Sequence, residues 1–277
     1  MTNQEEVKEL EKKAAYLRSV VFDMIMSAQT GHTGSDLSCA DILTTLYFKV
    51  LNIDPNNPED PNRDRYVQSK GHAAEILWAA LAERGFFDKE ELKTFSKFGS
   101  RLLGHPNNKV PGVEMNTGSL GHGLGVTTGM ALAAKLDGKS YKVYTLMGDG
   151  EQAEGSVWEA AMAAAHYKLN NLTAIIDNNG LQITGTNDEV MSSAPLADKW
   201  RAFGWYVIEV DGNDISQLIK AFNNQENGDK PKMIIAHTIK GKGFSGAENK
   251  ANWHHKVPTE AEYTQAKAEF QAEMEGN

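Results

Sequence analysis

The sequence predicts an α/β fold in which a mostly parallel sheet is covered by helices on both faces. Short apolar runs rich in β-forming residues alternate with longer runs of helical periodicity, and this alternation is typical of a parallel sheet. Of the 277 residues, 40% are apolar, which is enough for one large core. The chain shows no internal repeat, low-complexity tract or linker, so residues 1–277 are expected to form a single domain.

The first half of the chain is predicted from apolar spacing and from helix stop signals. Apolar side chains at steps of three and four between Val7 and Met24 predict an amphipathic helix that ends near Thr30. A helical pattern that stops at Gly85 predicts a further helix. The expected elements are helices at 7–30 and 41–50, a loop at 52–65, a short strand at 66–69, a helix at 73–84, an irregular glycine-rich segment at 99–121 and a helix at 123–136.

The central stretch, 142–185, predicts a β-α-β unit. One apolar run ends at the G-D-G turn around Asp149, and a second ends at the D-N-N-G turn of 177–180. Between them, Ser156 and Glu159 have the spacing of a capping box ahead of an alanine-rich helix. The expected elements from here onward are strands at 142–147, 172–176, 205–210 and 232–238, the last two of them buried, helices at 157–169, 195–203 and 214–222, a loop at 241–258, and a final helix that Thr259 and Glu262 cap.

The two turns of this unit are placed to bind a divalent cation. If the strands are parallel neighbours, Asp149 and Asn179 lie at the edge of the sheet where open α/β proteins bind ligands. Their oxygens and a carbonyl of the 180–181 turn suit Mg²⁺ or Ca²⁺, and the glycines beside Asp149 let a diphosphate approach the backbone. Each turn alone is also a common loop sequence. The two together, each ending a predicted strand, predict a magnesium-diphosphate site.

The net charge and the number of cysteines limit the binding partners and the cellular compartment expected for this chain. A net charge of −9 argues against nucleic acid or an anionic membrane surface as a partner. Cys39 is the only cysteine, which excludes an internal disulfide and suits a reducing cytoplasm. The charged N-terminus lacks the apolar core of a signal peptide, and the sequence has no apolar run long enough to span a membrane. We therefore expect a soluble, cytoplasmic protein.

Five of the eight histidines lie in glycine-flanked, loop-like settings. An isolated loop histidine is most often a solvated side chain. Several imidazoles beside one ligand, however, can donate hydrogen bonds to phosphate or sugar hydroxyls and exchange protons near neutral pH. The five are His32, His72, His105, His122 and His254.

The motifs around these residues resemble those of transketolase, in the same order and at matching separations over nearly the full chain. They correspond to its N-terminal, diphosphate-binding domain, and the G-D-G and N-N-G turns are by themselves similar to the motif of thiamine-diphosphate enzymes. The resemblance therefore implies thiamine diphosphate as the cofactor. The matching blocks are GHTGS, SKGHAA, GHP, TGSLGHGLG, GDGEQAEGSVWEA, DNNGL, FGW, VDGND and TIKGKG.

The resemblance also implies a role for each matched residue. The expected Mg²⁺ ligands, with Ca²⁺ or Mn²⁺ as alternative ions, are Asp149, Asn179 and the carbonyl oxygen of Leu181. The expected catalytic residues, which would face the sugar or the mouth of the site, are His32, His105 and His254. The expected cofactor-binding residues are Ser35, His72, Gly118, Ser119, Leu120, Gly150, Asn179, Lys240 and His254. Glu154 would lie at a subunit contact and take no part in the chemistry.

Two positions depart from the usual transketolase pattern. His122 stands where glutamine is usual, and Thr33 stands where proline or a similar residue is common. Neither change removes a ligand. His122 beside the aminopyrimidine would be able to alter the cofactor's tautomers, but we favour the interpretation that it only fills space.

A complete transketolase is more than twice the length of this chain. The resemblance implies that the pyrimidine-binding domain, whose glutamate activates the cofactor, and the C-terminal domain are absent here. Because the chain ends after a capped helix, we expect it to be a natural subunit rather than a fragment. It would be the N-terminal half of a two-chain transketolase, with a separate C-terminal partner in an α₂β₂ assembly. The reaction would move a two-carbon ketol unit from a ketose phosphate, such as xylulose 5-phosphate, to an aldose phosphate.

Other proteins share parts of this pattern. A 2-oxo acid dehydrogenase E1 α subunit or a deoxyxylulose-phosphate synthase relative has the same two turns, but decarboxylation of an oxo acid does not call for so many sugar-hydroxyl partners. A non-catalytic paralogue would bind the cofactor as a regulator, and the presence of every matched ligand argues against it. The donor and acceptor sugars stay open, and so does a specialised catabolic role.

Overall fold

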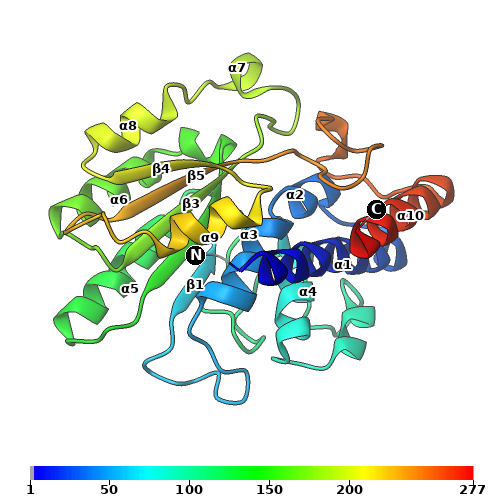
Figure 1. Cartoon of the computed structure of the whole chain (residues 1–277), viewed down its shortest axis with the longest axis horizontal. Helices are drawn as coiled ribbons and strands as arrows, with labels where there is room; N and C mark the ends of the chain where they lie inside the picture. Colours follow the sequence, from blue (N-terminus) through cyan, green and yellow to red (C-terminus); the bar gives the residue numbers. More distant parts are fainter. Residues whose placement is uncertain (1–2, 277) are drawn as a thin grey trace.

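The computed structural model describes residues 3–276, in which five strands form one sheet (Figure 1). The strands are β1 (Arg65–Gln68), β2 (Val143–Gly148), β3 (Leu172–Asn178), β4 (Tyr206–Asp211) and β5 (Lys232–His237). Their spatial order is β1-β2-β3-β5-β4, and every neighbouring pair is parallel. The helix α6 (Gly155–His166) connects β2 to its neighbour β3, which confirms the predicted β-α-β unit.

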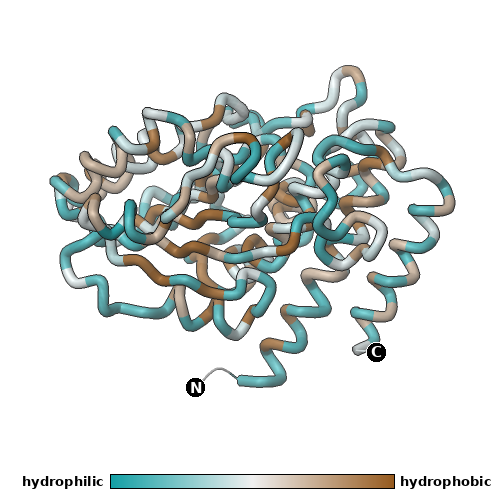
Figure 2. Tube along the Cα trace, turned by 90° about the horizontal axis from the view of Figure 1, so that it is seen from above, coloured by the Kyte–Doolittle hydropathy of each residue, from teal (hydrophilic) through white to brown (hydrophobic). Residues whose placement is uncertain are grey.

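Helices cover both faces of the sheet, as predicted. Successive side chains of a strand point to opposite faces, so Tyr144 and Leu146 of β2 enter one core while Val143 and Met147 enter the other. Many of the hydrophobic stretches, coloured brown, lie in the middle of the molecule (Figure 2). Helices on the first face are α1 (Gln4–Ala28), α3 (Ala40–Thr45), α4 (Ala74–Arg84) and α9 (Ile215–Asn223). Helices on the second face are α5 (Gly123–Leu136), α6 and α8 (Leu196–Ala202).

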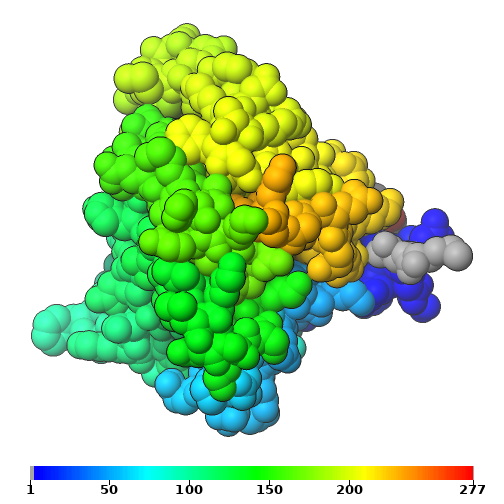
Figure 3. All heavy atoms as spheres, turned by 90° about the vertical axis from the view of Figure 1, so that its left-hand side faces the viewer, coloured from blue at the N-terminus to red at the C-terminus, as the bar shows by residue number. Residues whose placement is uncertain are grey.

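The second face is closed by aromatic contacts between α6 and α8. The ring centroids of Trp158 and Trp200 lie 5.1 Å apart. In the space-filling view, the green segment that carries α5 and α6 accordingly lies beside the yellow segment that carries α8 and β4 (Figure 3). Among residues 3–276, no helix has both the length and the apolar character that a bilayer crossing requires.

The segment between α1 and β1 is more divided than predicted. The helix expected at 41–50 is present as α3 followed by the π-helical turn η1 (Leu46–Val50). The short helix α2 (Thr33–Ser38) has no counterpart in the prediction, because its sequence, TGSDLS, shows no apolar periodicity. All six of its residues are buried, so this helix has no face exposed to solvent. The other short elements are η2 (Lys89–Thr94), η3 (Gly150–Ala153), α7 (Asn187–Val190) and η4 (Ala251–Trp253).

Two local predictions are wrong. Ser156 does not cap α6, because this helix begins at Gly155 after Glu154, and the Ser156 hydroxyl donates to the Gly121 carbonyl at 3.0 Å instead. The hydroxyl therefore ties the 121 turn to the helix. The strand at 205–210 is present as β4 but is not buried, because it is an edge strand that pairs only with β5, and most of its residues are partly or fully exposed.

The predicted C-terminal capping box is confirmed. The Thr259 N–H donates to the Glu262 carboxylate at 2.8 Å, and the Glu262 N–H donates to the Thr259 hydroxyl at 3.3 Å, at the start of α10 (Glu260–Glu275). This helix packs along α1, where the Phe22 and Phe270 rings make an edge contact at 5.3 Å (Figure 1). The two helices thereby hold the preceding loop, which includes the buried Trp253, against α2.

Candidate functional site

A cavity of about 460 Å³ lies at the carboxyl ends of β2 and β3. Gly148, the last residue of β2, pairs with Asp177 near the end of β3, so the turns that follow the two strands lie side by side. Loops from distant parts of the sequence complete the walls. The lining residues that the sequence analysis singles out are His32, Ser35, His72, Gly118, Leu120, Asp149, Gly150, Glu154, Asn179, Leu181, Lys240 and His254.

Asp149 is held by backbone amides of both turns. Its Oδ1 accepts the Gly150 N–H at 2.8 Å, and its Oδ2 accepts the Gly180 N–H at 2.6 Å. The same Oδ2 accepts the side-chain amide of Asn187 at 2.9 Å. The carboxylate therefore ties the first turn to the second and fixes the spacing of the two strand ends.

Asn179 and Leu181 add two further oxygens at this edge. Asn179 Oδ1 accepts the Leu181 N–H at 3.1 Å, while its Nδ2 lies 3.5 Å from the Ser38 hydroxyl and 3.4 Å from Asp177 Oδ2. These contacts turn the amide nitrogen toward the interior and the amide oxygen toward the turn. The Leu181 carbonyl accepts the Lys240 ammonium at 3.4 Å. The three predicted metal ligands are thus brought together.

This donor set fits a hard divalent cation. It consists of a carboxylate, an amide oxygen and a carbonyl, which are the oxygen ligands that Mg²⁺, Ca²⁺ and Mn²⁺ prefer. Burial, followed by the nearby Asp177 carboxylate, raises the pKa of Asp149. Both causes penalise the negative charge, and a bound cation would offset them. The residues present therefore fit Mg²⁺, whose remaining ligands usually come from phosphate and water.

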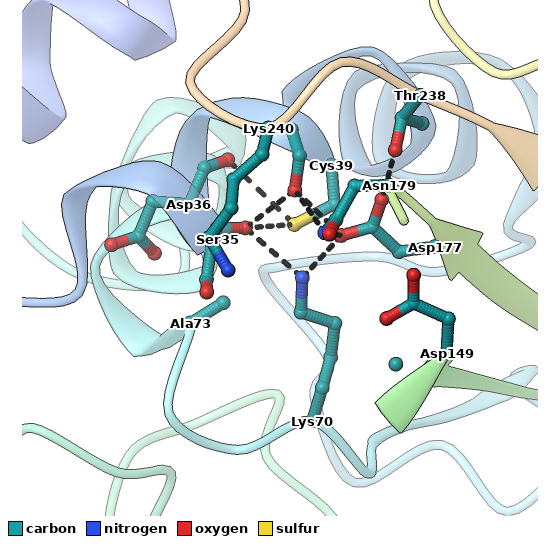
Figure 4. A network of polar contacts seen from close by, with 12 residues as sticks. Ser35, Asp36, Cys39, Lys70, Ala73, Asp149, Asp177, Asn179, Thr238 and Lys240 are labelled. Atoms are coloured by element: carbon teal, nitrogen blue, oxygen red, sulfur yellow. Dashed lines mark hydrogen bonds and ion pairs between the residues drawn. The ribbon is translucent and has the colours of Figure 1, made fainter. Parts of the chain in front are cut away.

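Beneath the two turns, Lys70 and Asp177 form a buried ion pair (Figure 4). Neither side chain is more than 2% exposed. Lys70 also donates to the Ser35 carbonyl at 3.0 Å, and Asp177 accepts the hydroxyls of Ser38 and Thr238. Burial alone would lower the pKa of Lys70, but the Asp177 carboxylate raises it above its ordinary value. The pair therefore stays charged, and it joins β3 to α2 and to the loop before α4.

Four imidazoles gather around His32 at one side of the cavity. The ring centroids of His72, His105, His254 and His255 lie 5.4, 5.9, 5.8 and 4.7 Å from that of His32. Burial, followed by His255 and His105, lowers the pKa of His32 to about 4. Burial lowers the pKa of His72 and of His105 as well. The predicted catalytic histidines are therefore brought together, and His32 is uncharged at neutral pH.

Lys240 and His254 form a second polar contact in the cavity wall. Lys240 Nζ lies 3.1 Å from His254 Nδ1. Burial, followed by Lys70, lowers the pKa of Lys240 to about 8, and burial, followed by Lys240, lowers the pKa of His254 to about 3. At pH 7 most Lys240 side chains are therefore protonated, while His254 is neutral. One ammonium and one uncharged imidazole are available to an anion in the cavity.

These shifts predict a titration that NMR can follow. In the folded chain, His32 and His254 are expected to titrate at about pH 4 and about pH 3. In the unfolded chain the two imidazoles take up protons near the ordinary histidine pKa of 6.5. The folded chain does not, so the free energy of unfolding decreases as the pH falls from 6.5 toward 4. Ring C–H signals, assigned with His32→Gln and His254→Gln, should show no midpoint of imidazole protonation between pH 7 and about pH 5.5. Above pH 7 the His254 signal should follow the ionisation of Lys240, whose Nζ lies 3.1 Å from it. A midpoint near 6.5 for either signal would contradict this prediction.

The loop of 118–120 borders the cavity, and His105, which is exposed and is not one of the lining residues, lies against this loop. Gly118 has a φ of 137°, and a side-chain carbon there would lie 2.6 Å from the His105 ring, so glycine is required where the loop passes this histidine. Leu120 lines the cavity, whereas Ser119 is exposed beside it. Ser35 contacts His72 within the cavity, since its hydroxyl lies 3.2 Å from His72 Nε2.

The two departures from the family pattern lie away from the predicted metal ligands. His122 is exposed, and its Nδ1 lies 3.0 Å from the Leu120 carbonyl. The Thr33 hydroxyl donates to the Lys256 carbonyl at 2.7 Å. That His122 only fills space stays a prediction. Glu154 is exposed at the rim, as a residue at a subunit contact would be before assembly.

Several residues that organise the site are missed by the sequence analysis. Of these, Lys70, Glu151 and Asp177 are buried, Asn187 is half-buried and His255 is exposed. Glu151 accepts the N–H groups of Gly121 and Gly148, 2.8 and 3.1 Å away, and so joins the 121 turn to the end of β2. An ionisable residue at the end of an otherwise apolar strand is a signal that would have identified Asp177. The missed residues are Lys70, Glu151, Asp177, Asn187 and His255.

Comparison with known proteins gives matches over nearly the whole chain. Residues 10–275 match the family described as "Transketolase, thiamine diphosphate binding domain". The chain is 48% identical to a subunit of the apulose-4-phosphate transketolase of Phocaeicola vulgatus, over 98% of this chain and 96% of that relative. It is 42% identical to a 6-deoxy-6-sulfo-D-fructose transketolase subunit of a Clostridium species, over 96% of this chain and 97% of that relative.

Complete transketolases match over part of their length. The solved transketolase of Campylobacter jejuni superimposes with a TM-score of 0.90 at 33% identity, covering 98% of this chain and 43% of that one. Human transketolase is 43% identical over 92% of this chain and 41% of its own length. The chain therefore spans about two fifths of these complete transketolases and nearly all of the relatives that are named as subunits.

Proposed function

Since this chain belongs to the transketolase family, we propose that it is the N-terminal subunit of a transketolase assembled from two kinds of chain. Relatives named as transketolase subunits match it nearly end to end, whereas complete transketolases extend well beyond it. A separate partner chain would supply the rest of the enzyme. The observation that carries the proposal is the meeting of Asp149, Asn179 and the Leu181 carbonyl at one edge of the sheet.

We propose that this edge binds thiamine diphosphate through Mg²⁺. Asp149, Asn179 and the Leu181 carbonyl would hold the ion, and Gly150 would let the diphosphate lie against the backbone. The protonated Lys240 lies beside the Leu181 carbonyl and would add a positive charge next to the phosphates. When bound, this cofactor supplies the carbon nucleophile and the electron sink that carbon–carbon cleavage of a ketose needs. Ser35, His72, the 118–120 loop and His254 would line the rest of it.

The histidines would orient the sugar and move its protons. A neutral imidazole has one N–H donor and one acceptor, so it can bond a sugar hydroxyl from either side without adding charge. His32 and His254 are neutral at pH 7, and His105 lies next to His32. Such a group can pass a proton to or from a hydroxyl as the carbon–carbon bond breaks or forms. The chain's contribution to the reaction is thus to bind, orient and exchange protons.

The partner chain would provide the pyrimidine-binding domain, with the glutamate that activates the cofactor, and the C-terminal domain. The cofactor would then lie between two chains, with its diphosphate on this one. We propose an α₂β₂ assembly with two-fold symmetry, and a place for the exposed Glu154 at one of its contacts. Working in a reducing cytoplasm would suit a chain with a single buried cysteine, Cys39.

The reaction we propose is transfer of a two-carbon ketol unit from a ketose to an aldose phosphate. Relatives are named for apulose 4-phosphate and for 6-deoxy-6-sulfo-D-fructose, which carry a phosphate and a sulfonate. Donors to compare are therefore these two sugars and xylulose 5-phosphate. All three end in an anion, and the residues that bind this anion would come largely from the partner chain.

Reconstitution tests the proposed function. The isolated chain is expected to give no ketol transfer, because it lacks the activating glutamate, and transfer should appear when a candidate partner with a pyrimidine-binding domain is added. The partner alone is the control. Consumption of pyruvate in place of a ketose would favour the oxo-acid or deoxyxylulose-phosphate synthase alternatives, and cofactor binding without turnover would favour a regulatory paralogue. Ketol transfer by the pure chain would contradict the two-chain proposal.

A further inference from the structure

Two carboxyl groups meet in the interior behind His32. Asp36 of α2 and Glu75 of α4 are both 0% exposed, and each side chain lies close enough to the other to affect its pKa. An ionised carboxylate only accepts hydrogen bonds, so two ionised carboxylates cannot bond to each other. A hydrogen bond between the two carboxyls therefore requires a proton on at least one of them.

The four carboxyl oxygens divide into an outer and an inner pair. The outer oxygens accept backbone N–H groups, Asp36 Oδ1 from Ile76 at 3.1 Å and Glu75 Oε1 from His32 at 3.2 Å. The inner oxygens, Asp36 Oδ2 and Glu75 Oε2, are buried, and no donor from residues 3–276 reaches them. Buried polar atoms are rarely left unpaired, and one proton held between the inner oxygens would satisfy both of them.

We propose that Asp36 and Glu75 share a single proton at neutral pH and that this acid pair positions His32. The outer oxygen of Glu75 accepts the His32 N–H, and a side-chain carbon at Gly31 would lie 2.6 Å from the same oxygen. The loop that carries His32 therefore rests on the pair. The role of His32 toward a sugar rests on the proposed function, whereas the shared proton is a property of the chain itself.

The charged neighbours of the pair favour retention of this proton. Lys70 is the cation that acts on Asp36, and its ammonium is already engaged in a buried ion pair. His32 above the pair and the Cys39 thiol behind it are both neutral at pH 7. Burial, followed by repulsion between the two carboxyls, raises the pKa of Asp36, and burial raises the pKa of Glu75 to about 7. A second negative charge is therefore poorly compensated.

Because proton binding is linked to folding, the shared proton predicts the direction in which stability changes with pH. The folded chain keeps a proton that the unfolded chain releases above pH 4.5, the ordinary pKa of the Glu75 side chain. The pair's contribution to the free energy of unfolding should therefore fall as the pH rises from 4.5 to above 7, whereas the contribution of His32 and His254 rises between pH 4 and 6.5. In Glu75→Gln the pair's contribution is expected to disappear, because an amide has no such proton to release.

Infrared difference spectra of the full chain in D₂O test for the shared proton. A protonated carboxyl has a C=O band separate from those of carboxylates, and at pH 7 Glu75→Gln and Asp36→Asn should each remove one such band. In both variants an amide N–H replaces the proton between the inner oxygens. Asp64→Asn, which removes a buried carboxylate that already accepts the N–H groups of Asn52 and Lys142, should leave the band in place. The proposal would be overturned if the band of the protonated carboxyl persisted in both Glu75→Gln and Asp36→Asn, or if the wild type lacked this band.

A double-mutant cycle at pH 7 distinguishes a shared proton from two independent carboxyls. Each single amide can donate inward and still accept at its outer oxygen, so the unfolding constants of the single variants should lie within about threefold of the wild type. In Asp36→Asn/Glu75→Gln the two amides cannot satisfy all of these contacts. If both amide oxygens accept the backbone N–H groups, the two NH₂ groups face each other, and if one amide is flipped, its NH₂ group faces a backbone N–H. The unfolding constant of the double variant should exceed the product of the single effects by about tenfold or more. Additive effects, or a double variant more stable than both singles, would overturn the proposal.

Hydrogen exchange at the His32 amide measures the positioning role. Exchange should stay within about threefold of the wild type in each single variant and rise by about tenfold or more in the double variant. Equal rates in all four chains would show that the pair does not hold this loop. None of these measurements needs cofactor, partner or turnover. Their failure would leave the proposed transfer reaction intact, and a failed reconstitution would leave the shared proton intact.

Discussion

The Asp149→Asn variant is expected to lose at least about 100-fold in thiamine diphosphate affinity, since removal of partners that only orient metal ligands already costs 10- to 100-fold. The substitution removes the one charged ligand of the proposed ion. It also leaves a single acceptor oxygen where two are needed, because Asp149 accepts Gly150 through Oδ1 and Gly180 through Oδ2. The two turns would separate as the charge is lost.

Calorimetric titration of the cofactor with Mg²⁺ into the assembled enzyme measures this loss. Asp137→Asn is the matched control, because it removes the same charge from an exposed position at the far end of α5 and should bind as the wild type does. Circular dichroism of both variants checks that the fold is retained. An Asp149→Asn enzyme that binds the cofactor as tightly as the control would exclude this carboxylate as a ligand.

Replacing Lys70 by methionine is expected to destabilise the chain by about 3–5 kcal/mol, the usual result of leaving a buried charge without its partner. The Asp177 carboxylate is fully buried, and only two hydroxyl groups and the Asn179 amide, all uncharged, would then be left to compensate its charge. Domains of this size are stable by about 5–15 kcal/mol, so the loss would be a large share of the total. Urea denaturation of the purified chain gives the change in the free energy of unfolding.

A surface ion pair provides the control for this variant. Lys168 pairs with Asp229 at 2.7 Å, with both side chains largely exposed, so Lys168→Met should change the stability little. Adding Asp177→Asn to Lys70→Met should recover part of the loss, because it removes the uncompensated charge. Equal effects of the two lysine substitutions would contradict the view that the buried pair organises the strand ends.

Strands and long helices are predictable from this sequence because their signals are local. The apolar runs that end at the two turns identify β2 and β3, and a parallel pairing then places Asp149 beside Asn179. The C-terminal capping box is likewise contained in four residues. Ser156 has the same spacing as that box, yet its hydroxyl bonds the Gly121 carbonyl. Sequence spacing alone cannot show that a distant backbone oxygen competes for a capping side chain.

The site is predictable where it rests on motifs and unpredictable where it rests on tertiary contacts. The proposed metal ligands, His32 and His72 stand within recognisable blocks. The ion pair of Lys70 and Asp177 joins residues more than one hundred positions apart, so the apolar strand can mark Asp177 as unusual but cannot identify its partner. Asp36 and Glu75 are similar, because only the packing of α2 against α4 shows that both carboxyls are buried in contact.

The central claim is that the ends of β2 and β3 jointly hold a divalent ion that binds a diphosphate. Crystals of the assembled enzyme grown with thiamine diphosphate and Mn²⁺, which has an anomalous X-ray signal, test it directly. The account predicts an anomalous peak at bonding distance from the Asp149 carboxylate, Asn179 Oδ1 and the Leu181 carbonyl, with phosphate oxygens completing the shell. A cofactor bound with its ion elsewhere, or with its diphosphate outside this cavity, would contradict it.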